Sequence, residues 1–219
     1  MTAAPATTGT VARPARRGLP PVVLALAFVV PFVASVAGSS IIGDATFPSP
    51  FAADADIRRY FAGNHDAVVL QSLLQCVSSV ALLLLAVRLA EAAGGAAARL
   101  ITAAGGVAAA FHVLSAMVGW VAVRDAVQAD GPLVRALHDL AFLTGGPAGV
   151  AALGVMIGAT AAGLGAALPG WARAAGLVLL ALALLSLLCL AAQPAAFLLP
   201  IARFGGMLWL IFATVRMTR

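Results

Sequence analysis

Long apolar stretches alternate with short polar ones along the whole chain, and this pattern predicts six membrane-spanning helices. A transmembrane helix needs roughly 20 mostly apolar residues, because each residue rises about 1.5 Å along the helix axis. No stretch shows the alternating segments, each about ten residues long, that build transmembrane barrels. We therefore predict an all-α fold, a polytopic transmembrane helical bundle. The expected spans are 19–41, 67–87, 100–123, 140–162, 171–192 and 196–215.

Residues 1–18, before the first expected span, are rich in Ala, Thr and Pro and end with Arg13, Arg16 and Arg17. Terminal segments of this kind are poorly ordered unless something ties them down. We therefore predict a disordered cytoplasmic tail over 1–18, followed by one six-helix transmembrane domain over 19–219.

The longest loop, 43–66, follows the first span and has helical features. Ser49-Pro50 has the pattern of an N-cap followed by a first helical residue, and Ile57, Tyr60 and Phe61 form an apolar side. We predict a short helix lying in the membrane interface. A plain solvated loop is the alternative.

Composition agrees with a membrane protein. Of 219 residues, 63% are hydrophobic and 10% are charged, whereas soluble domains are roughly 45–50% apolar and about 25% charged. The apolar excess must face lipid, so we expect membrane lipids as partners. The net charge of +5 does not indicate nucleic-acid binding, because the arginines are scattered rather than clustered in patches.

The arginines predict the orientation in the membrane, since cytoplasmic loops carry an excess of Lys and Arg. With the N-terminus inside, eight arginines fall in cytoplasmic segments and five in outer ones. We predict a multi-pass protein of the cell (plasma) membrane with both termini in the cytoplasm. The eight are Arg13, Arg16, Arg17, Arg88, Arg99, Arg173, Arg216 and Arg219; the five are Arg58, Arg59, Arg124, Arg135 and Arg203.

The fourth span carries small residues at four-residue spacing, Gly145 with Gly149 and Gly154 with Gly158. Such pairs let helix backbones approach closely, so we expect this helix to sit centrally. They also permit a homo-oligomer or a membrane-protein partner without requiring either. Pro147 removes one backbone donor and is expected to kink the helix.

Polar side chains inside the second and third spans are the main candidates for function. Gln71 and Gln75 lie one helical turn apart, and His112 lies near the middle of the third span with Ser115 close by. Amides that face hydrocarbon cost several kcal/mol, so this polar intramembrane zone must face other helices or water. It either joins helices by hydrogen bonds, roughly 0.6–2 kcal/mol each, or lines a polar pocket or proton path.

A His-Asp pair occurs twice, as His65-Asp66 and His138-Asp139, each near the start of a span. The two pairs could form a divalent-metal site if their helices are neighbours. The alternative is helix capping, because the macrodipole favours acids at helix N-termini. We assign no catalytic residue and expect no cofactor, since the GxSxG, HExxH, P-loop and GxGxxG signatures do not occur.

Three stretches carry a resemblance: 53–61 before the second span, 168–171 before the fifth, and the last helix with its terminal Arg216 and Arg219. In these the chain resembles a loose group of small six-span membrane proteins of GC-rich bacteria, a family whose function is uncharacterised. The use of arginine as the sole basic residue fits such a genome. The resemblance implies the architecture and no functional residue.

Three functions are compatible with this sequence. The first is a non-catalytic envelope protein or an accessory, partner-binding bundle. The second is a small transporter or channel that uses the Gln71, Gln75 and His112 zone. The third is a metal-dependent enzyme at the outer membrane interface that uses the two His-Asp pairs.

Overall fold

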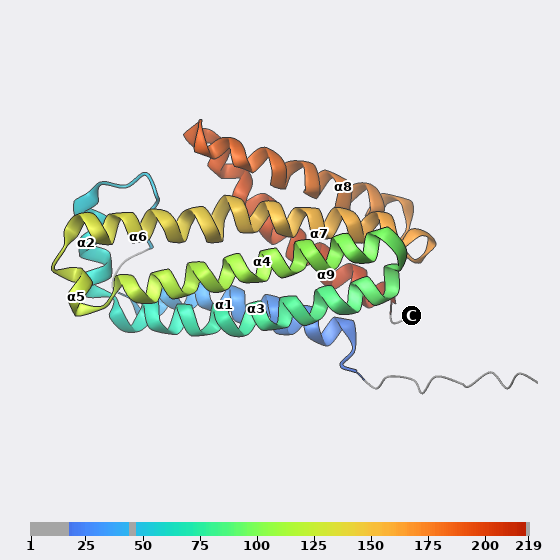
Figure 1. Ribbon diagram of the computed structural model, residues 1–219, viewed down its shortest axis with the longest axis horizontal. Helices are drawn as coiled ribbons and strands as arrows, with labels where there is room; N and C mark the ends of the chain where they lie inside the picture. The colour runs from blue at the N-terminus through green and yellow to red at the C-terminus, as the bar shows by residue number, and fades with distance from the viewer. Residues whose placement is uncertain (1–17, 44–46, 218–219) are drawn as a thin grey trace, which may run out of the picture.

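The computed structural model describes residues 18–43 and 47–217, without the side chains of Ser39 and Ser40, and the described part folds as a helical bundle without strands (Figure 1). Six helical stretches are long and apolar enough to cross a membrane, so the predicted all-α, six-span fold is confirmed and the chain is membrane-embedded. The tail predicted over 1–18 lies almost entirely outside the described residues. The six stretches are Pro21–Gly38, His65–Ala93, Gly95–Ala122, Gly131–Gly163, Gly170–Leu190 and Gln193–Met217.

Figure 1 shows the helices running along one common direction, with α2 and α5 at one end of the bundle. We call this the α2 end, and we call the opposite end, where the described chain begins and stops, the terminal end. In chain order the elements are α1 (Pro21–Ile42), α2 (Asp54–Gly63), α3 (His65–Ala93), α4 (Gly95–Ala122), α5 (Asp125–Gln128), α6 (Gly131–Leu143), η1 (Thr144–Ala148), α7 (Gly149–Gly163), η2 (Gly165–Ala167), α8 (Gly170–Leu185), η3 (Ser186–Leu190), η4 (Gln193–Phe197) and α9 (Leu198–Met217).

The second and third spans are longer than their apolar stretches, because α3 and α4 continue to a tight turn at the terminal end. Gly94 and Gly95 form this turn with φ angles of 68° and 56°. These left-handed conformations suit glycine, which has no Cβ. The polar residues Arg88, Glu91 and Arg99, which bounded the predicted spans, therefore lie on helices rather than in a loop.

The apolar core occupies the terminal half of the bundle. It joins α1, α3, α4, α7 and α9, and its largest members are fully buried. They include Leu82, Leu85 and Leu89 of α3, Ile101 of α4, Met156 and Ile157 of α7, and Leu210 of α9. Side chains on the outer face of α8, such as Leu177, Val178 and Leu185, are at least half exposed, as is expected of a lipid-facing wall.

The glycines of the fourth span allow close packing, as predicted. A Cβ on Gly154 would overlap Ala183 of α8, and one on Gly158 would lie 2.6 Å from a methyl carbon of Leu180. Most of this span is buried, so α7 is central to the bundle.

A helix occurs in the first long loop, but it begins at Asp54 and not at Ser49 as expected. Ser49 instead opens a turn: its carbonyl accepts from the N–H of Ala52 at 2.9 Å. Pro50 suits this turn because its fixed φ fits the second turn position. The apolar side of α2 is buried against the bundle, with Ile57 at 0% and Phe61 at 1% exposure.

Candidate functional site

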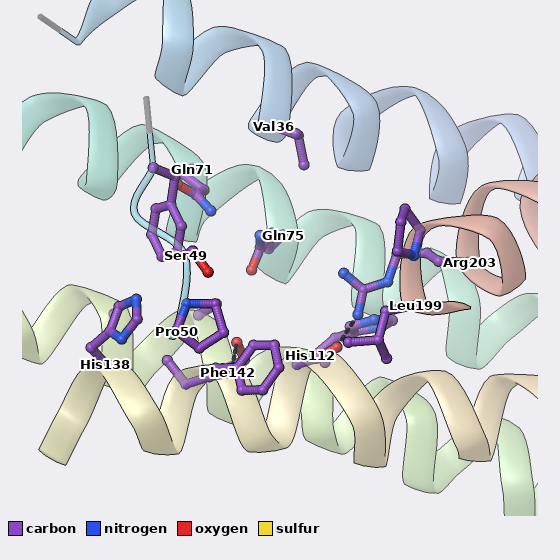
Figure 2. A pocket seen from close by; sticks show the side chains of 18 of the residues that line it. Val36, Ser49, Pro50, Gln71, Gln75, His112, His138, Phe142, Leu199 and Arg203 are labelled. Carbon is purple, nitrogen blue, oxygen red and sulfur yellow. Dashed lines mark hydrogen bonds between the residues drawn. The ribbon is translucent and has the colours of Figure 1, made fainter. Parts of the chain in front are cut away.

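A cavity of about 600 Å³ lies toward the α2 end, among α1, α3, α4, α6, η1, η4, α9 and the segment 47–51 (Figure 2). Small-molecule sites are typically roughly 300–1,000 Å³ and mostly apolar, with a few polar groups. Several aromatic rings line this cavity, and polar side chains of α3, α4, α6 and α9 also line it. The cavity therefore has the size and the character of a ligand site.

All four residues of the predicted polar zone line this cavity: Gln71 and Gln75 from α3, and His112 and Ser115 from α4. Ser115 Oγ donates to the Ala141 carbonyl at 2.8 Å and so joins α4 to α6. Gln71 Oε1 is buried without a hydrogen-bond partner. The structure thus brings the zone together around one space, and its role stays a prediction.

His112 does not make the hydrogen bond across the bundle that the simpler interpretation required. It is 3% exposed, and neither Nδ1 nor Nε2 has a hydrogen-bond partner among the residues that the structure describes. Its ring lies instead among aromatic side chains, 5.7 Å from the centroid of Phe32 and 6.4 Å from that of Phe28. A buried polar group without a partner costs about 1–3 kcal/mol, so the imidazole has bonding capacity to offer a ligand.

Arg203 is the residue that the sequence reasoning missed. It was counted among the outer arginines, but it lies inside the sixth span, on α9, and lines the cavity. Its Nη2 donates to the carbonyl of Gly145, and its guanidinium lies 5.2 Å from the ring centroid of Phe32. The available signal was an ionisable residue inside an apolar stretch, which by default marks a functional position in membranes.

The partners of Arg203 compensate its charge only in part. A charged side chain at the centre of a span costs about 2.5–3.5 kcal/mol on insertion scales. Hydrogen bonds to charged groups return about 1.5–3 kcal/mol, and a cation–π contact about 0.5–2 kcal/mol. Both partners of Arg203 are neutral, and its Nε is buried without a partner. Within the described ranges, no acidic side chain lies within ion-pair distance of it.

The carbonyl that binds Arg203 belongs to a break in the fourth span. Residues Thr144–Ala148 form a π-helical turn, and Gly146 has the non-helical angles φ −79° and ψ −107°. Pro147 lacks an N–H and cannot bond the carbonyl four residues before it. The kink expected at Pro147 is therefore confirmed, and the break frees backbone carbonyls beside the cavity.

The segment 47–54 covers the α2 end of the cavity and is fixed there by α6. Arg135 donates to the carbonyls of Pro50 and Ala52 at 3.0 and 3.1 Å and to Asp54 Oδ1 at 2.8 Å. Its Nε bonds Asp139 at 2.9 Å. The ring of His138 stacks on Phe47 with centroids 5.6 Å apart.

The two His-Asp pairs do not come together as a metal site. His65 is exposed and bonds Asp66 at 3.0 Å, whereas His138 is 1% exposed and lines the cavity. Asp139 is engaged by Arg135. Among the residues that the structure describes, no group of three or more His, Cys, Asp or Glu side chains is placed to hold a metal ion. The metal site considered as one possibility from the sequence lacks a ligand set among the described residues, because His138 points inward while His65 lies at an exposed helix end.

Comparisons of the chain with protein-family models, curated proteins and solved structures found no match. The resemblance noted in the sequence accordingly stays a prediction.

Proposed function

We propose that this protein is a non-catalytic membrane protein that binds a small amphiphilic ligand in the cavity at its α2 end. One observation supports this most: a single, mostly apolar cavity is lined by Gln71, His112 and Arg203, and each of these has a buried polar atom without a hydrogen-bond partner among the described residues. Buried polar groups are nearly always hydrogen-bonded in native structures. A ligand with a polar head and an apolar body would supply the missing partners and fill the cavity. This proposal keeps the accessory, partner-binding class expected from the sequence and gives the bound partner a chemistry.

Transport is the second candidate, and the break at Thr144–Ala148 favours it. In many transporters, interrupted helices form the substrate site near the bilayer midplane. The terminal half of this bundle is closed by the apolar core. Transport would therefore require that half to open, whereas binding requires no rearrangement of the core.

We also propose that the protein lies in the cell membrane with both termini in the cytoplasm, so that the cavity opens in the outer half. The arginine count from the sequence, eight cytoplasmic against five outer, supports this orientation. Reporter fusions at the two termini test this: both are expected to report the cytoplasm, and an outer signal from either would contradict it.

A matched pair of glycines on α4 tests ligand binding. Gly119 lines the cavity, and a Cβ there would approach only Ser72 Oγ, at 3.8 Å. Gly106 lies on the same helix outside the cavity, with no atom within 4 Å of an added Cβ. Gly119→Leu should fill the cavity without breaking the fold, whereas Gly106→Leu should leave the cavity empty.

The measurement is saturable binding of two probes, laurate and dodecanol, to the full chain in phosphatidylcholine nanodiscs. We expect wild type and Gly106→Leu to bind at least one probe equally well, and Gly119→Leu to bind it at least about tenfold more weakly, a loss of about 1.4 kcal/mol. Equal binding by Gly119→Leu, or no binding beyond that of empty nanodiscs by wild type, would contradict the proposal.

A further inference from the structure

The charge inside the cavity is positive. Arg203 is the one arginine along its wall, and no Asp or Glu of the described chain lines it. Arginine stays protonated in proteins, so the site carries this charge at every physiological pH. Its electrostatic field thus favours an anion over a neutral molecule, and a neutral molecule over a cation.

The guanidinium retains free bonding capacity toward the cavity. Its planar group has five N–H donors, of which one hydrogen bond, from Nη2 to the Gly145 carbonyl, is formed. Among the described residues, Nη1 forms no hydrogen bond. Carboxylates and phosphates match the fork of an arginine with two parallel hydrogen bonds. An oxyanion would therefore satisfy both the charge and the remaining hydrogen-bond donors of Arg203.

His112 lies near Arg203, at the end of the cavity away from His138 (Figure 2). Both ring nitrogens of His112 are buried, and neither has a hydrogen-bond partner among the described residues. Arg203 of α9 and His112 of α4 thus bring two polar side chains to the same part of the cavity wall.

The rest of the site suits an apolar chain. Phe32, Phe142 and Leu199 line the cavity beside Arg203. Two further lining residues, Phe197 and Phe204, are 76% and 39% exposed, so the wall continues onto the lipid-facing surface. An acyl chain could thus extend from the head group toward the bilayer.

We propose that the ligand is a single-chain anionic amphiphile, with a carboxylate or phosphate head held by Arg203 beside His112 and an apolar chain along the aromatic wall. This inference rests on the proposed function. It adds the sign of the head-group charge, which ligand binding alone does not require.

Four probes with the same 12-carbon chain test the inference: laurate, dodecyl phosphate, dodecanol and dodecyltrimethylammonium. The full chain is held in phosphatidylcholine nanodiscs at about pH 9, so that laurate stays ionised although membranes raise carboxyl pKa values. We expect at least one anionic probe to bind about 10- to 100-fold more tightly than dodecanol. The tighter of the two anions identifies the head group as carboxylate or phosphate.

Variants assign this preference to Arg203. In Arg203→Gln we expect the anionic probes to bind no better than dodecanol, with dodecanol binding unchanged. Arg203→Lys should keep part of the preference. Arg124→Gln is the control, because Arg124 is exposed and outside the cavity, and it should behave as wild type.

The outcomes separate the two proposals. Equal binding of dodecanol and the anions by wild type, or tighter binding of the cation, overturns the anionic ligand and leaves the ligand site standing. A preference that survives Arg203→Gln, or that disappears in Arg124→Gln, overturns the assignment to Arg203. Binding of no probe overturns both proposals. The comparison of probes on wild type decides the sign of the charge even if Arg203→Gln does not fold.

Discussion

The two halves of this bundle share several long helices, including α3, α4 and α9, but differ in how these helices are packed. In the terminal half, large apolar side chains such as Leu85, Ile101 and Met156 are fully buried. A hydroxyl there, on Thr160, bonds the Met156 carbonyl of its own helix at 2.7 Å. In the α2 half, the helices surround a cavity, and His112 and Arg203 keep buried nitrogens without partners.

This difference suggests that the terminal half contributes most of the stability, whereas the α2 half provides the space for a ligand. Protein interiors are packed as densely as organic crystals, and in a bilayer such packing drives helix association because lipid offers little hydrophobic drive. The terminal half meets this requirement. Around its cavity, the α2 half has less dense packing and fewer hydrogen bonds, which we propose leaves room for a ligand.

The largest loss of stability should come from removing a buried side chain from the terminal half. Leu85→Ala removes a fully buried side chain of α3 and should lower the free energy of unfolding by about 1–3 kcal/mol. This is at the low end for leucine-to-alanine changes, because the lost methyl groups otherwise contact lipid and not water. Reversible unfolding in mixed micelles measures it.

Leu84→Ala is the matched control, since Leu84 is the neighbouring residue on α3 and is 46% exposed. Its free energy of unfolding should change by less than about 0.5 kcal/mol. Equal losses in the two variants would show that the terminal half does not carry the stability assigned to it here.

A smaller, local effect is expected at the α2 end. Arg135→Gln removes the ion pairs with Asp54 and Asp139 and weakens the hydrogen bonds that hold the segment 47–54. Partly exposed ion pairs contribute about 0–1 kcal/mol, so global stability should change little. Amide hydrogen exchange in this segment should rise about three- to fivefold, as the same energy allows.

Arg59→Gln provides the comparison for this experiment. Arg59 pairs with Asp56 at 2.8 Å on the exposed side of α2 and does not contact the segment. It should leave the exchange rates unchanged. If Arg135→Gln raised exchange in the terminal half instead, the segment would not be an independent cover of the cavity.

The sequence was sufficient to predict the spans and half of the site. Gln71, Gln75 and His112 interrupt apolar stretches, and the cost of facing lipid applies to each residue separately. The common orientation of Gln71 and Gln75 follows from their helical spacing on α3. The helix ends were less accurate, because α3 extends to Ala93 through residues too polar for the bilayer core.

The rest of the site depends on contacts between distant segments. Arg203 binds Gly145, 58 positions away, and Arg135 binds the Pro50 carbonyl, 85 positions away. Neither contact produces a periodic pattern in the sequence from which it could be predicted. His138 and His65 are both followed by an aspartate, but their exposure differs. His138 is buried at the cavity, whereas His65 is exposed at the start of α3.

The π-helical turn at Thr144–Ala148 also changes the angular phase of the fourth span. An α-helix rotates about 100° per residue, and a π-turn inserts roughly one residue into a turn. Everything after Ala148 is therefore rotated by about that angle relative to α6. Before the turn, α6 directs His138 toward the cavity, and after it α7 presents Gly154 and Gly158 to α8. A helical wheel drawn through 131–163 as one rod would not describe the positions of residues after Ala148 relative to α6.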